Sequence, residues 1–306
     1  MTTCLVLGAG FIGSHIAELL VKKGYQVKIF DISFDSVDNG LIKAAECFKG
    51  DFCNYIGWKE VLHGVDYIFH NICTTIPKTA DDDPVRDIET NVISNVRLFK
   101  ELINSGIKKI IFSSSGGTIY GEPAILPISE EHPSDPISSY AISKLSIEKY
   151  LHYFRYHYGL DYVSLRYSNA YGIGQNPFGM LGAVTIFIRR LVDRQPITVF
   201  GDGSIVRDYI YVDDIARANL CVMQGQTRHE SYNVGTGVGI SIRDLIALIF
   251  RVTGMSTEVN YLNKRSNDVS KNILDISLIK QELDWAPEID LEDGILRIWE
   301  YFKQNG

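Results

Sequence analysis

The sequence predicts an α/β fold in which helices cover both faces of a doubly wound parallel sheet. Short apolar runs alternate with stretches that repeat apolar residues every three or four positions. A glycine-rich turn joins the first such run to the first such stretch. The chain has 306 residues, of which 45% are hydrophobic, and this is enough for one large unit or for two lobes that share a cleft.

The first predicted strand, 4–7, leads into three glycines with the spacing Gly-x-Gly-x-x-Gly. Apolar residues at helical spacing follow at once, so the glycines form a turn from a strand to a helix. Such a turn lets the backbone approach a pyrophosphate, and N–H groups at the helix N-terminus bind the anion. The dinucleotide-binding residues predicted here are Gly8, Gly10, Phe11, Ile12 and Gly13.

The second predicted strand, 27–32, carries Asp31 near its end. An acid at that place accepts hydrogen bonds from an adenosine ribose and repels a 2′-phosphate, so NAD is expected rather than NADP. Ile32, the next residue, is predicted to bind the same cofactor. Asp51 and Phe52 close an intervening strand. They either contact the adenine or are an ordinary strand-end acid and a core aromatic residue, and the sequence leaves both interpretations open.

Further strands are predicted at 67–72 and 107–112, with a helix at 91–105 between them. The run 113–118, Ser-Ser-Ser-Gly-Gly-Thr, follows the last of these strands. Ligands of doubly wound folds bind at the carboxyl ends of the strands, so these hydroxyls can reach a substrate. Taken alone, however, a Ser/Gly cluster is also typical of an ordinary loop.

A long helix is predicted over 138–157, and it places Tyr140 and Lys144 one turn apart on the same face. Free tyrosine has a pKa of about 10, so it is a poor base near neutrality unless a nearby cation stabilises the phenolate. A solvated helix face gives the same spacing. The order of the glycine turn, the strand-end hydroxyls and then this pair favours an acid/base site in one cleft.

The net charge of −7 and the absence of a basic run argue against nucleic acid or a membrane surface as a partner. The five cysteines show no Cys-x-x-Cys spacing and the seven histidines form no ligand cluster, so neither a disulfide framework nor a metal site is expected. No span reaches membrane length. We therefore expect a cytoplasmic protein with a small-molecule partner.

Taken in order, these motifs resemble the extended short-chain dehydrogenase/reductase family. Within it, the NAD-dependent sugar epimerases and dehydratases are similar, and the UDP-hexose (UDP-glucose/UDP-N-acetylglucosamine) 4-epimerases look closest. The resemblance covers nearly the whole chain. It is carried by GAGFIGSH, Asp31, SSSGGTIYG, YAISK, LRYSNAYG, GDGSIVRDYIYVDD, YNVGTG and the segment 265–268.

The resemblance implies that Tyr140 is the catalytic acid/base and that Lys144 lowers its pKa and holds the nicotinamide ribose. A Ser or Thr completes the implied triad. Counting back from Tyr140 gives Ser115, whereas counting back from the Tyr-Gly pair that follows the serines gives Gly116. Ser115 is therefore the first candidate and Thr118 the second, and the sequence also allows that neither serves.

The resemblance implies further binding residues along the chain. Asn91 and Tyr167 look like cofactor residues. The implied substrate-binding residues are Ser115, Thr118, Asn169, Arg207, Arg265 and Asp268. The two arginines would clamp the phosphates of a sugar nucleotide, because a planar guanidinium bonds phosphate oxygens in a bidentate way, and Asp268 would bind the nucleoside ribose.

The implied reaction is the NAD-dependent 4-epimerisation of a nucleotide sugar through a transient 4-keto intermediate. Asn272 stands where glucose-restricted relatives have a bulky aromatic residue, so a UDP-N-acetylhexosamine is a candidate substrate beside a UDP-hexose. A second interpretation is an NAD(P)-dependent 4-keto sugar nucleotide reductase. A third, from another class, is a non-catalytic NAD-binding protein.

The implied architecture is an NAD-binding Rossmann domain over 1–165 and a smaller sugar-nucleotide-binding lobe over 166–306, with 205–235 returning to the first. The predicted helices 91–105 and 138–157 carry apolar stripes. By family likeness these would pair with a second copy in a homodimer, although they can equally face the sheet. A role in polysaccharide biosynthesis would fit such an enzyme.

Overall fold

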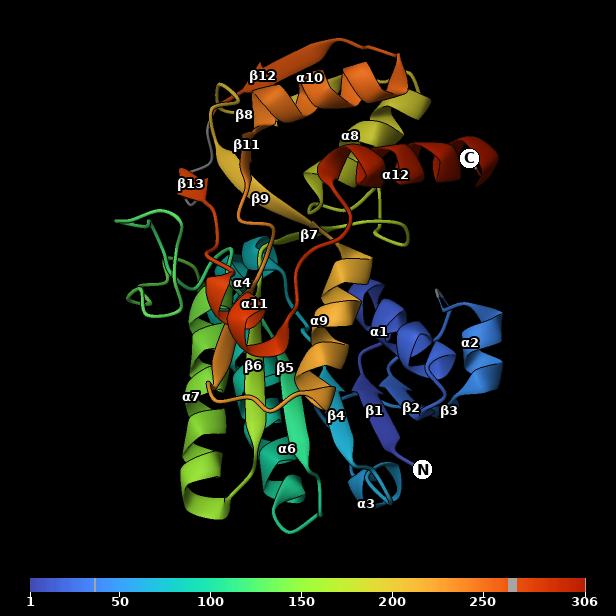
Figure 1. Ribbon diagram of the computed structural model, residues 1–306, viewed down its shortest axis with the longest axis vertical. Helices are drawn as coiled ribbons and strands as arrows, with labels where there is room; N and C mark the ends of the chain where they lie inside the picture. Colours follow the sequence, from blue (N-terminus) through green and yellow to red (C-terminus); the bar gives the residue numbers. More distant parts are fainter. Residues whose placement is uncertain (36, 264–268, 306) are drawn as a thin grey trace.

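The structure is a computed structural model that describes residues 1–35, 37–263 and 269–305, and it has two lobes stacked along its long axis (Figure 1). The larger lobe contains one seven-stranded sheet. Its strands are β1 (Thr3–Leu7), β2 (Gln26–Asp31), β3 (Glu46–Lys49), β4 (Tyr67–His70), β5 (Lys109–Ser115), β6 (Tyr162–Tyr167) and β10 (Ser231–Val234). The order is β10-β6-β5-β4-β1-β2-β3 and every neighbouring pair is parallel, which confirms the predicted doubly wound sheet.

The central strands are apolar on both faces because helices cover both faces. All five residues of β1 and all six of β6 are buried. Alternate residues of β1 enter two different cores: Cys4 and Val6 pack on one face, Leu5 and Leu7 on the other. The sheet therefore separates two hydrophobic layers.

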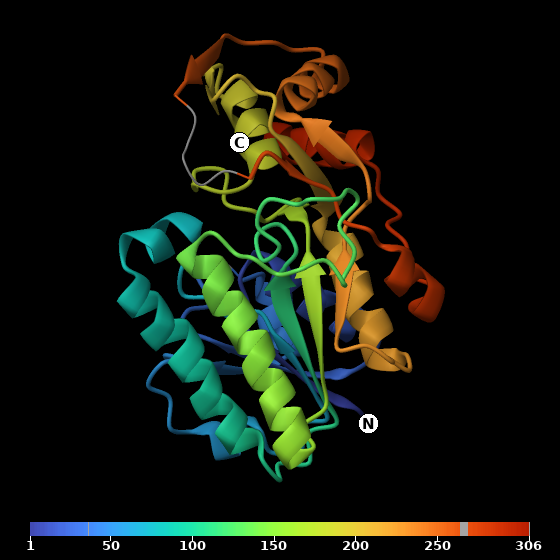
Figure 2. The same cartoon turned by 90° about the vertical axis from the view of Figure 1, so that its left-hand side faces the viewer.

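Helices from distant parts of the chain form these layers. One face is covered by α1 (Phe11–Lys22), α2 (Asn39–Ala44), α9 (Val212–Gln224) and α11 (Ser277–Leu283). The other is covered by α3 (Trp58–Val61), α6 (Ser94–Leu102) and α7 (Ser139–Tyr158). Figure 2 shows α6 and α7 side by side on the outer side of the larger lobe.

The predicted helix 91–105 begins earlier and is less regular than its apolar spacing suggests. The short helices α4 (Pro77–Asp82) and α5 (Pro84–Asp87) come first. A π-helical segment, η1 (Ile88–Ile93), then joins α5 to α6. Single π turns are often found at functional sites, and this one contains Asn91.

The smaller lobe is built on a second sheet. Its strands are β7 (Asn169–Tyr171), β9 (Val206–Tyr211), β11 (Gly239–Ser241) and β13 (Lys271–Asn272), beside a separate pair, β8 (Ile197–Phe200) and β12 (Val259–Leu262). The helices α8 (Ala183–Val192), α10 (Ile242–Thr253) and α12 (Leu291–Asn305) pack on them. Within 205–235, β9 belongs to this sheet, whereas α9 and β10 lie with the larger one.

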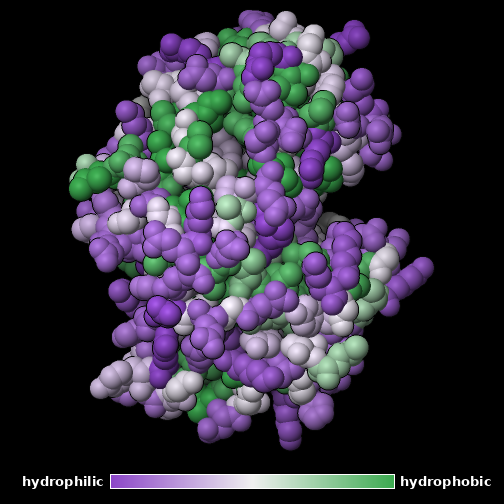
Figure 3. Space-filling view, viewed as in Figure 1, coloured by the Kyte–Doolittle hydropathy of each residue, from purple (hydrophilic) through white to green (hydrophobic). Residues whose placement is uncertain are grey.

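The two lobes meet at the carboxyl ends of the large sheet. Figure 2 shows the arrows of β5 and β6 pointing toward the smaller lobe. In the space-filling view the outline is indented between the lobes, on the side where α12 and α2 lie (Figure 3). The ends of parallel strands next to such a second layer are where doubly wound folds bind ligands. None of the described helices is long and apolar enough to cross a membrane.

Candidate functional site

The glycine turn lies between β1 and α1, and two of its glycines are required by geometry. Gly8 has a φ of +89°, and a Cβ on Gly13 would stand 1.8 Å from the Gly8 carbonyl oxygen. Gly10 is the N-cap of α1, with no side-chain cap and no heavy atom within 4 Å of a Cβ built there. Helix and turn are thus in close contact, and the first N–H groups of α1 have no capping side chain.

Asp31 lies beside this turn at the end of β2. Its carboxylate accepts hydrogen bonds from the N–H of Ala9, at 2.6 Å, and from that of Ser33, at 3.1 Å. Ile32, the next residue, is 64% exposed. A glycine cradle with an acid at its edge fits an adenine dinucleotide, so the structure places the predicted cofactor residues of the first two strands together.

Asp51 and Phe52 lie just beyond β3, not within it as the sequence predicted, and they have different environments. The Phe52 side chain is buried, and its ring meets those of Trp58 and His70 edge to face. Asp51 is exposed, and hydrogen bonds from the backbone N–H of Cys53 and from a neighbouring amide lower its pKa. Asp51 is therefore open to solvent, whereas Phe52 is part of the core.

The serine run belongs to the sheet. Strand β5 continues to Ser115, whereas the sequence predicted a strand that ends at Phe112 and a loop thereafter. The hydroxyls are tolerated in a buried strand because each has a partner. Ser113 Oγ donates to Asn71 Oδ1 at 2.6 Å, and Ser114 Oγ donates to Glu148 Oε1 at 2.5 Å.

Tyr140 lies in the first turn of α7, directly opposite the end of β5. The Ser115 hydroxyl hydrogen-bonds to the Tyr140 phenol, and Thr118 Oγ1 donates to Ser115 Oγ at 2.9 Å. The structure therefore joins both candidate hydroxyls and the phenol in one chain. Lys144 is buried, donates to the Ser113 carbonyl at 2.8 Å, and has its Nζ 5.9 Å from the Tyr140 ring centroid.

A side chain at Gly116 would point into packed neighbours. A Cβ at Gly116 would stand 2.6 Å from Leu274 Cδ1 and 2.8 Å from the Arg166 carbonyl oxygen. Counting back from the Tyr-Gly pair placed Gly116 where a hydroxyl residue was expected. The structure shows that Gly116 is a glycine because its neighbours leave no room for a side chain. The geometry supports Ser115 as the hydroxyl partner of Tyr140.

The surroundings of Tyr140 raise the pKa of its phenol. Burial is the largest cause that raises the pKa of its phenol, the charges of Cys73 and Asp87 add to it, and the Ser115 hydrogen bond lowers it. The lowering effect assigned to Lys144 stays a prediction. A phenol in this setting needs an added positive charge nearby before it can act as a base near neutrality.

Asn91 and Tyr167, the other predicted cofactor residues, are buried and engaged within the protein. Asn91 Oδ1 accepts the N–H of Thr74, and its Nδ2 donates to Asp87 Oδ1 at 2.9 Å. The Tyr167 hydroxyl accepts from Asn219 Nδ2 at 2.8 Å, and burial raises its pKa to about 12. Both side chains thus support the segments around the site.

Two further predicted substrate residues, Asn169 and Arg207, lie in strands of the smaller lobe. Asn169 in β7 donates to the Asp208 carbonyl at 3.1 Å, and Arg207 in β9 donates to the Val206 carbonyl at 2.9 Å. Arg265 and Asp268 lie outside the described residues. Asn272 in β13 pairs in register with Arg207, so these strands bring both residues to the same part of the sheet.

Asn272 also contacts the segment that follows β5. Its Nδ2 donates to the Gly116 carbonyl at 2.9 Å, which links the smaller lobe to the loop after β5. The side chain is 1% exposed, and its Oδ1 has no hydrogen-bond partner among the described residues. The residue is therefore small, buried and adjacent to the Ser115 segment.

The sequence interpretation missed two buried acids near the site. Asp87 binds the first turn of α7 through serine hydroxyls, and Glu148 pairs with Arg166 at 2.7 Å. The available signals were the spacings: Asp87 precedes Asn91 by one turn and Glu148 follows Lys144 by one turn. Spacing alone does not show which elements these residues face.

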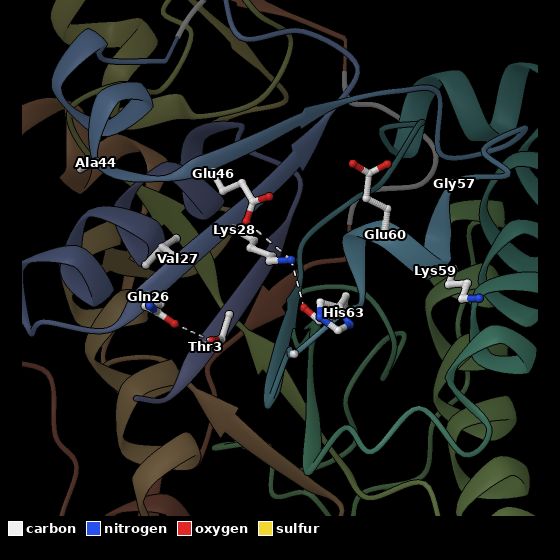
Figure 4. Close-up of a pocket in the computed structure, with 11 residues that line it drawn as sticks. Thr3, Gln26, Val27, Lys28, Ala44, Glu46, Gly57, Lys59, Glu60 and His63 are labelled. Carbon is white, nitrogen blue, oxygen red and sulfur yellow. Dashed lines mark hydrogen bonds and ion pairs between the residues drawn. The ribbon is translucent and has the colours of Figure 1, made fainter.

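A surface hollow of about 1060 Å³ lies elsewhere, at the amino ends of β1 and β2 (Figure 4). Figure 4 shows Lys28 inside it, with its ammonium 3.6 Å from Glu46 and 3.0 Å from the His63 carbonyl. None of the predicted site residues lines it. Among the residues that the structure describes, no cluster of His, Cys, Asp or Glu could hold a metal ion.

Residues 4–235 match the model of the NAD dependent epimerase/dehydratase family. The UDP-glucose 4-epimerase of Mycolicibacterium smegmatis is 34% identical over 312 residues, which cover 100% of this chain and 99% of that one.

Two solved structures are similar over the whole chain. A UDP-glucose 4-epimerase from Thermotoga maritima, solved with UDP-glucose, has a TM-score of 0.92 and 38% identity, covering 99% of both chains. A UDP-N-acetylglucosamine 4-epimerase from Methanobrevibacter ruminantium, in complex with UDP-N-acetylmuramic acid, has a TM-score of 0.93 and 30% identity. That match covers 100% of this chain and 99% of the other.

Proposed function

Because the chain belongs to the NAD dependent epimerase/dehydratase family, we propose that it inverts C4 of a UDP-sugar with NAD as its cofactor. The hydroxyl chain of Thr118, Ser115 and Tyr140 at the carboxyl end of β5 is the observation that carries this proposal. It provides a proton acceptor and donor at the edge of a dinucleotide-binding sheet. The family resemblance and this geometry both support Tyr140 as the acid/base group.

In the proposed reaction, Tyr140 accepts the proton of the sugar 4-hydroxyl and later returns it. NAD, held by the glycine turn and Asp31, would supply the hydride chemistry at C4. Ser115 hydrogen-bonds to the phenol and so holds it toward the reacting oxygen. Lys144 is the cation proposed to favour the phenolate and to bind the nicotinamide ribose.

In the proposed reaction, the nucleotide must stay bound while the 4-keto sugar rotates to present its other face. Arg207 of β9 and Arg265 are proposed to hold the diphosphate, with Asn169 of β7 beside it. Asp268 is proposed to bind the nucleoside ribose. Guanidinium groups bind phosphate oxygens in pairs, so this end of the substrate would be fixed while the hexose keeps some freedom.

The test of the activity is Tyr140→Phe. We expect the variant to bind NAD and UDP as the wild type does and to lose a factor of about 10²–10⁴ in turnover, because only the proton transfer is removed. Products from UDP-glucose and UDP-galactose are read by NMR. Full activity in the variant contradicts the assignment of Tyr140.

The same assay separates the alternatives. A 4-keto sugar nucleotide reductase would consume one NADH or NADPH in each turnover, whereas a 4-epimerase interconverts the two sugars with no net redox change. A non-catalytic NAD-binding protein would bind NAD without any turnover. Adding or omitting reduced cofactor therefore distinguishes the three functions.

We propose UDP-N-acetylglucosamine as a substrate beside UDP-glucose. Asn272, buried next to Gly116, is small where glucose-restricted relatives are bulky, and this supports room for an N-acetyl group. Turnover of UDP-glucose and UDP-N-acetylglucosamine is compared in parallel. A strict preference for UDP-glucose contradicts this part of the proposal.

We propose a homodimer in which α6 and α7 pair with the same helices of a second copy. The helices of this side expose large apolar side chains, namely Val85, Ile88, Ile93, Ile142 and Tyr153. Such exposed residues favour an interface. Light scattering tests the proposal, and a monomer at micromolar concentration contradicts it.

We also propose a cytoplasmic location. The five unpaired cysteines fit this location.

A further inference from the structure

Asp87, the last residue of α5, is fully buried, and its carboxylate joins three segments that meet beside the catalytic tyrosine. Oδ1 accepts hydrogen bonds from Thr75 Oγ1 and from Asn91 Nδ2. Oδ2 accepts from Ser143 Oγ at 2.6 Å and from Ser139 Oγ at 3.1 Å. The segments joined are the loop after β4, the π turn and the start of α7.

The position of the two serines makes this arrangement relevant to the reaction. Ser139 immediately precedes Tyr140, and Ser143 immediately precedes Lys144. The carboxylate of Asp87 therefore binds two serines that lie one turn apart on the same face of α7 and that each precede a predicted site residue. A shift of that turn would move the phenol away from Ser115.

The charge of Asp87 is unusual for a buried acid. Its partners among the described residues are three hydroxyls and one amide, all of them neutral, whereas buried carboxylates are ordinarily paired with a cation. Among the described residues, no cation pairs with this carboxylate. Asp87 is also one of the groups that raise the pKa of the Tyr140 phenol.

We propose that Asp87 is a positioning residue that fixes Tyr140 against Ser115 and places a negative charge beside the phenol. This inference rests on the proposed function, because it assigns a role within that acid/base chemistry. It adds a residue that touches neither the substrate nor the cofactor and acts through the helix that carries Tyr140.

The charge has a chemical purpose in a reaction where the same group accepts and returns a proton. Lys144 and the positive nicotinamide both favour the phenolate, and a phenolate that is too stable returns its proton poorly. Asp87 opposes them: after burial, the charges of Cys73 and Asp87 raise the pKa of Tyr140. A second acid at this turn is Asp81 of α4, whose carboxylate accepts a hydrogen bond from the backbone N–H of Ser139.

Two variants separate the charge from the geometry. Asp87→Asn keeps the shape and removes the charge, so we expect the acid limb of the pH profile of kcat/KM to move to lower pH by about one unit. Ser143→Ala keeps the charge and removes the shortest serine contact, so kcat should fall roughly tenfold while KM and the acid limb stay unchanged.

Asp83→Asn is the matched control. Asp83 is the exposed N-cap of α5, and Asn retains that cap, so the same change of charge occurs on the same helix but away from the phenol. We expect neither kcat nor the acid limb to change. A shift as large as that of Asp87→Asn would show that the net charge of the protein, rather than the position of Asp87, is responsible, and it would overturn the proposal.

A second readout does not depend on turnover. The phenolate of Tyr140 is titrated by ultraviolet absorbance in the NAD-loaded protein, as the difference between each protein and the same protein carrying Tyr140→Phe. We expect Asp87→Asn to lower this pKa, and an unchanged pKa together with an unchanged acid limb overturns the proposal. A lowered pKa in a protein without epimerase activity supports the role of Asp87 while the proposed function fails.

If Asp87→Asn does not fold, Ser143→Ala decides. A kcat of Ser143→Ala within about twofold of the wild type overturns the positioning role.

Discussion

Gly116 lies where the loop after β5 passes between β6 and β13. A side chain at this position would collide with Leu274 and with the Arg166 carbonyl. We expect Gly116→Ala to lower the free energy of unfolding by about 1–3 kcal/mol, because Leu274 has to shift and the backbone oxygen cannot move freely. Urea denaturation measures the loss.

Gly117→Ala is the control for this substitution. A Cβ at Gly117 would meet only Ser115 Oγ, at 4.0 Å, which is an ordinary contact. Its free energy of unfolding should stay within about 0.5 kcal/mol of the wild type. Equal destabilisation by the two substitutions would mean that the alanine side chain is not what Gly116 excludes.

Asn272 carries a prediction about the sugar. We expect Asn272→Tyr to reduce kcat/KM for UDP-N-acetylglucosamine at least about tenfold more than for UDP-glucose, because the added ring takes the room of an N-acetyl group. Asn272→Ser removes the hydrogen bond to Gly116 without adding bulk, and it should affect both sugars equally. Parallel steady-state assays measure the ratio, and an unchanged ratio in Asn272→Tyr contradicts the prediction.

Single residues also show how far a sequence can predict a site. Asp31 and the three glycines follow from local spacing, because strand, turn and helix are contiguous in the chain. The choice between Ser115 and Gly116 does not, because a shift of one residue along a strand turns the side chain to the other face. Asp87 was missed because three of its four partners lie 12 to 56 residues away in the chain.

Helix α7 is held on strand β5 by side chains at successive turns. Tyr140 meets Ser115, Lys144 donates to the Ser113 carbonyl, and Glu148 accepts from the Ser114 hydroxyl. These contacts set the position of α7 along β5. The geometry of the acid/base pair is thus a property of the helix and strand together.

Glu148→Gln tests this attachment. Arg166 is buried and bonded to Glu148 through Nε and Nη2, so the substitution leaves a buried guanidinium without its counter-charge. We expect a loss of about 3–5 kcal/mol in the free energy of unfolding, measured by urea denaturation. Glu101→Gln, at an exposed position of α6, is the control and should change stability by less than about 0.5 kcal/mol.

The elements were predicted more accurately in type than in extent. Apolar periodicity placed β1, β2, β4 and β5 and the helix 138–157, which runs from Ser139 to Tyr158, but it did not predict β6 or β10. It ended β5 three residues early, because polar residues at the end of a strand look like a loop until their buried partners are known. It also missed η1, since a π turn keeps the apolar residues of a helix and changes only the hydrogen-bonding pattern.

His15 joins the two lobes of the molecule. Its Nδ1 lies 2.8 Å from Asp213 Oδ1 of α9, and its Nε2 lies 2.9 Å from the carbonyl oxygen of Ile173, which packs on the core of the smaller lobe. Both partners are acceptors, so both ring nitrogens donate, and only the charged imidazolium can do this.

The charge of His15 predicts how stability depends on pH. Burial is the largest single influence and lowers its pKa, but the hydrogen bonds to Asp213 and Ile173 and the charges of Asp213 and Glu18 together raise the pKa above 6.5. The contribution is complete below pH 6.5 and is lost as the pH rises through the raised value.

Thermal unfolding between pH 5 and pH 9 measures this loss. We expect the stability difference between the wild type and His15→Gln to shrink as the pH rises, because only the charged imidazole makes both bonds. His152→Gln, at an exposed ion pair with Glu230, is the control and should show a much smaller dependence. A constant difference across the range would show that His15 is neutral in the folded protein.

The large sheet is completed by β10, which pairs with β6 although the whole of β7, β8 and β9 lies between them in the chain. During synthesis, β6 is therefore an unpaired edge until residue 234 has left the ribosome. An apolar edge of this kind invites pairing with other chains. The order in which the polypeptide emerges thus makes a sheet that lacks only β10 an obligatory stage, and it predicts that the fragment 1–165 aggregates where the full chain folds.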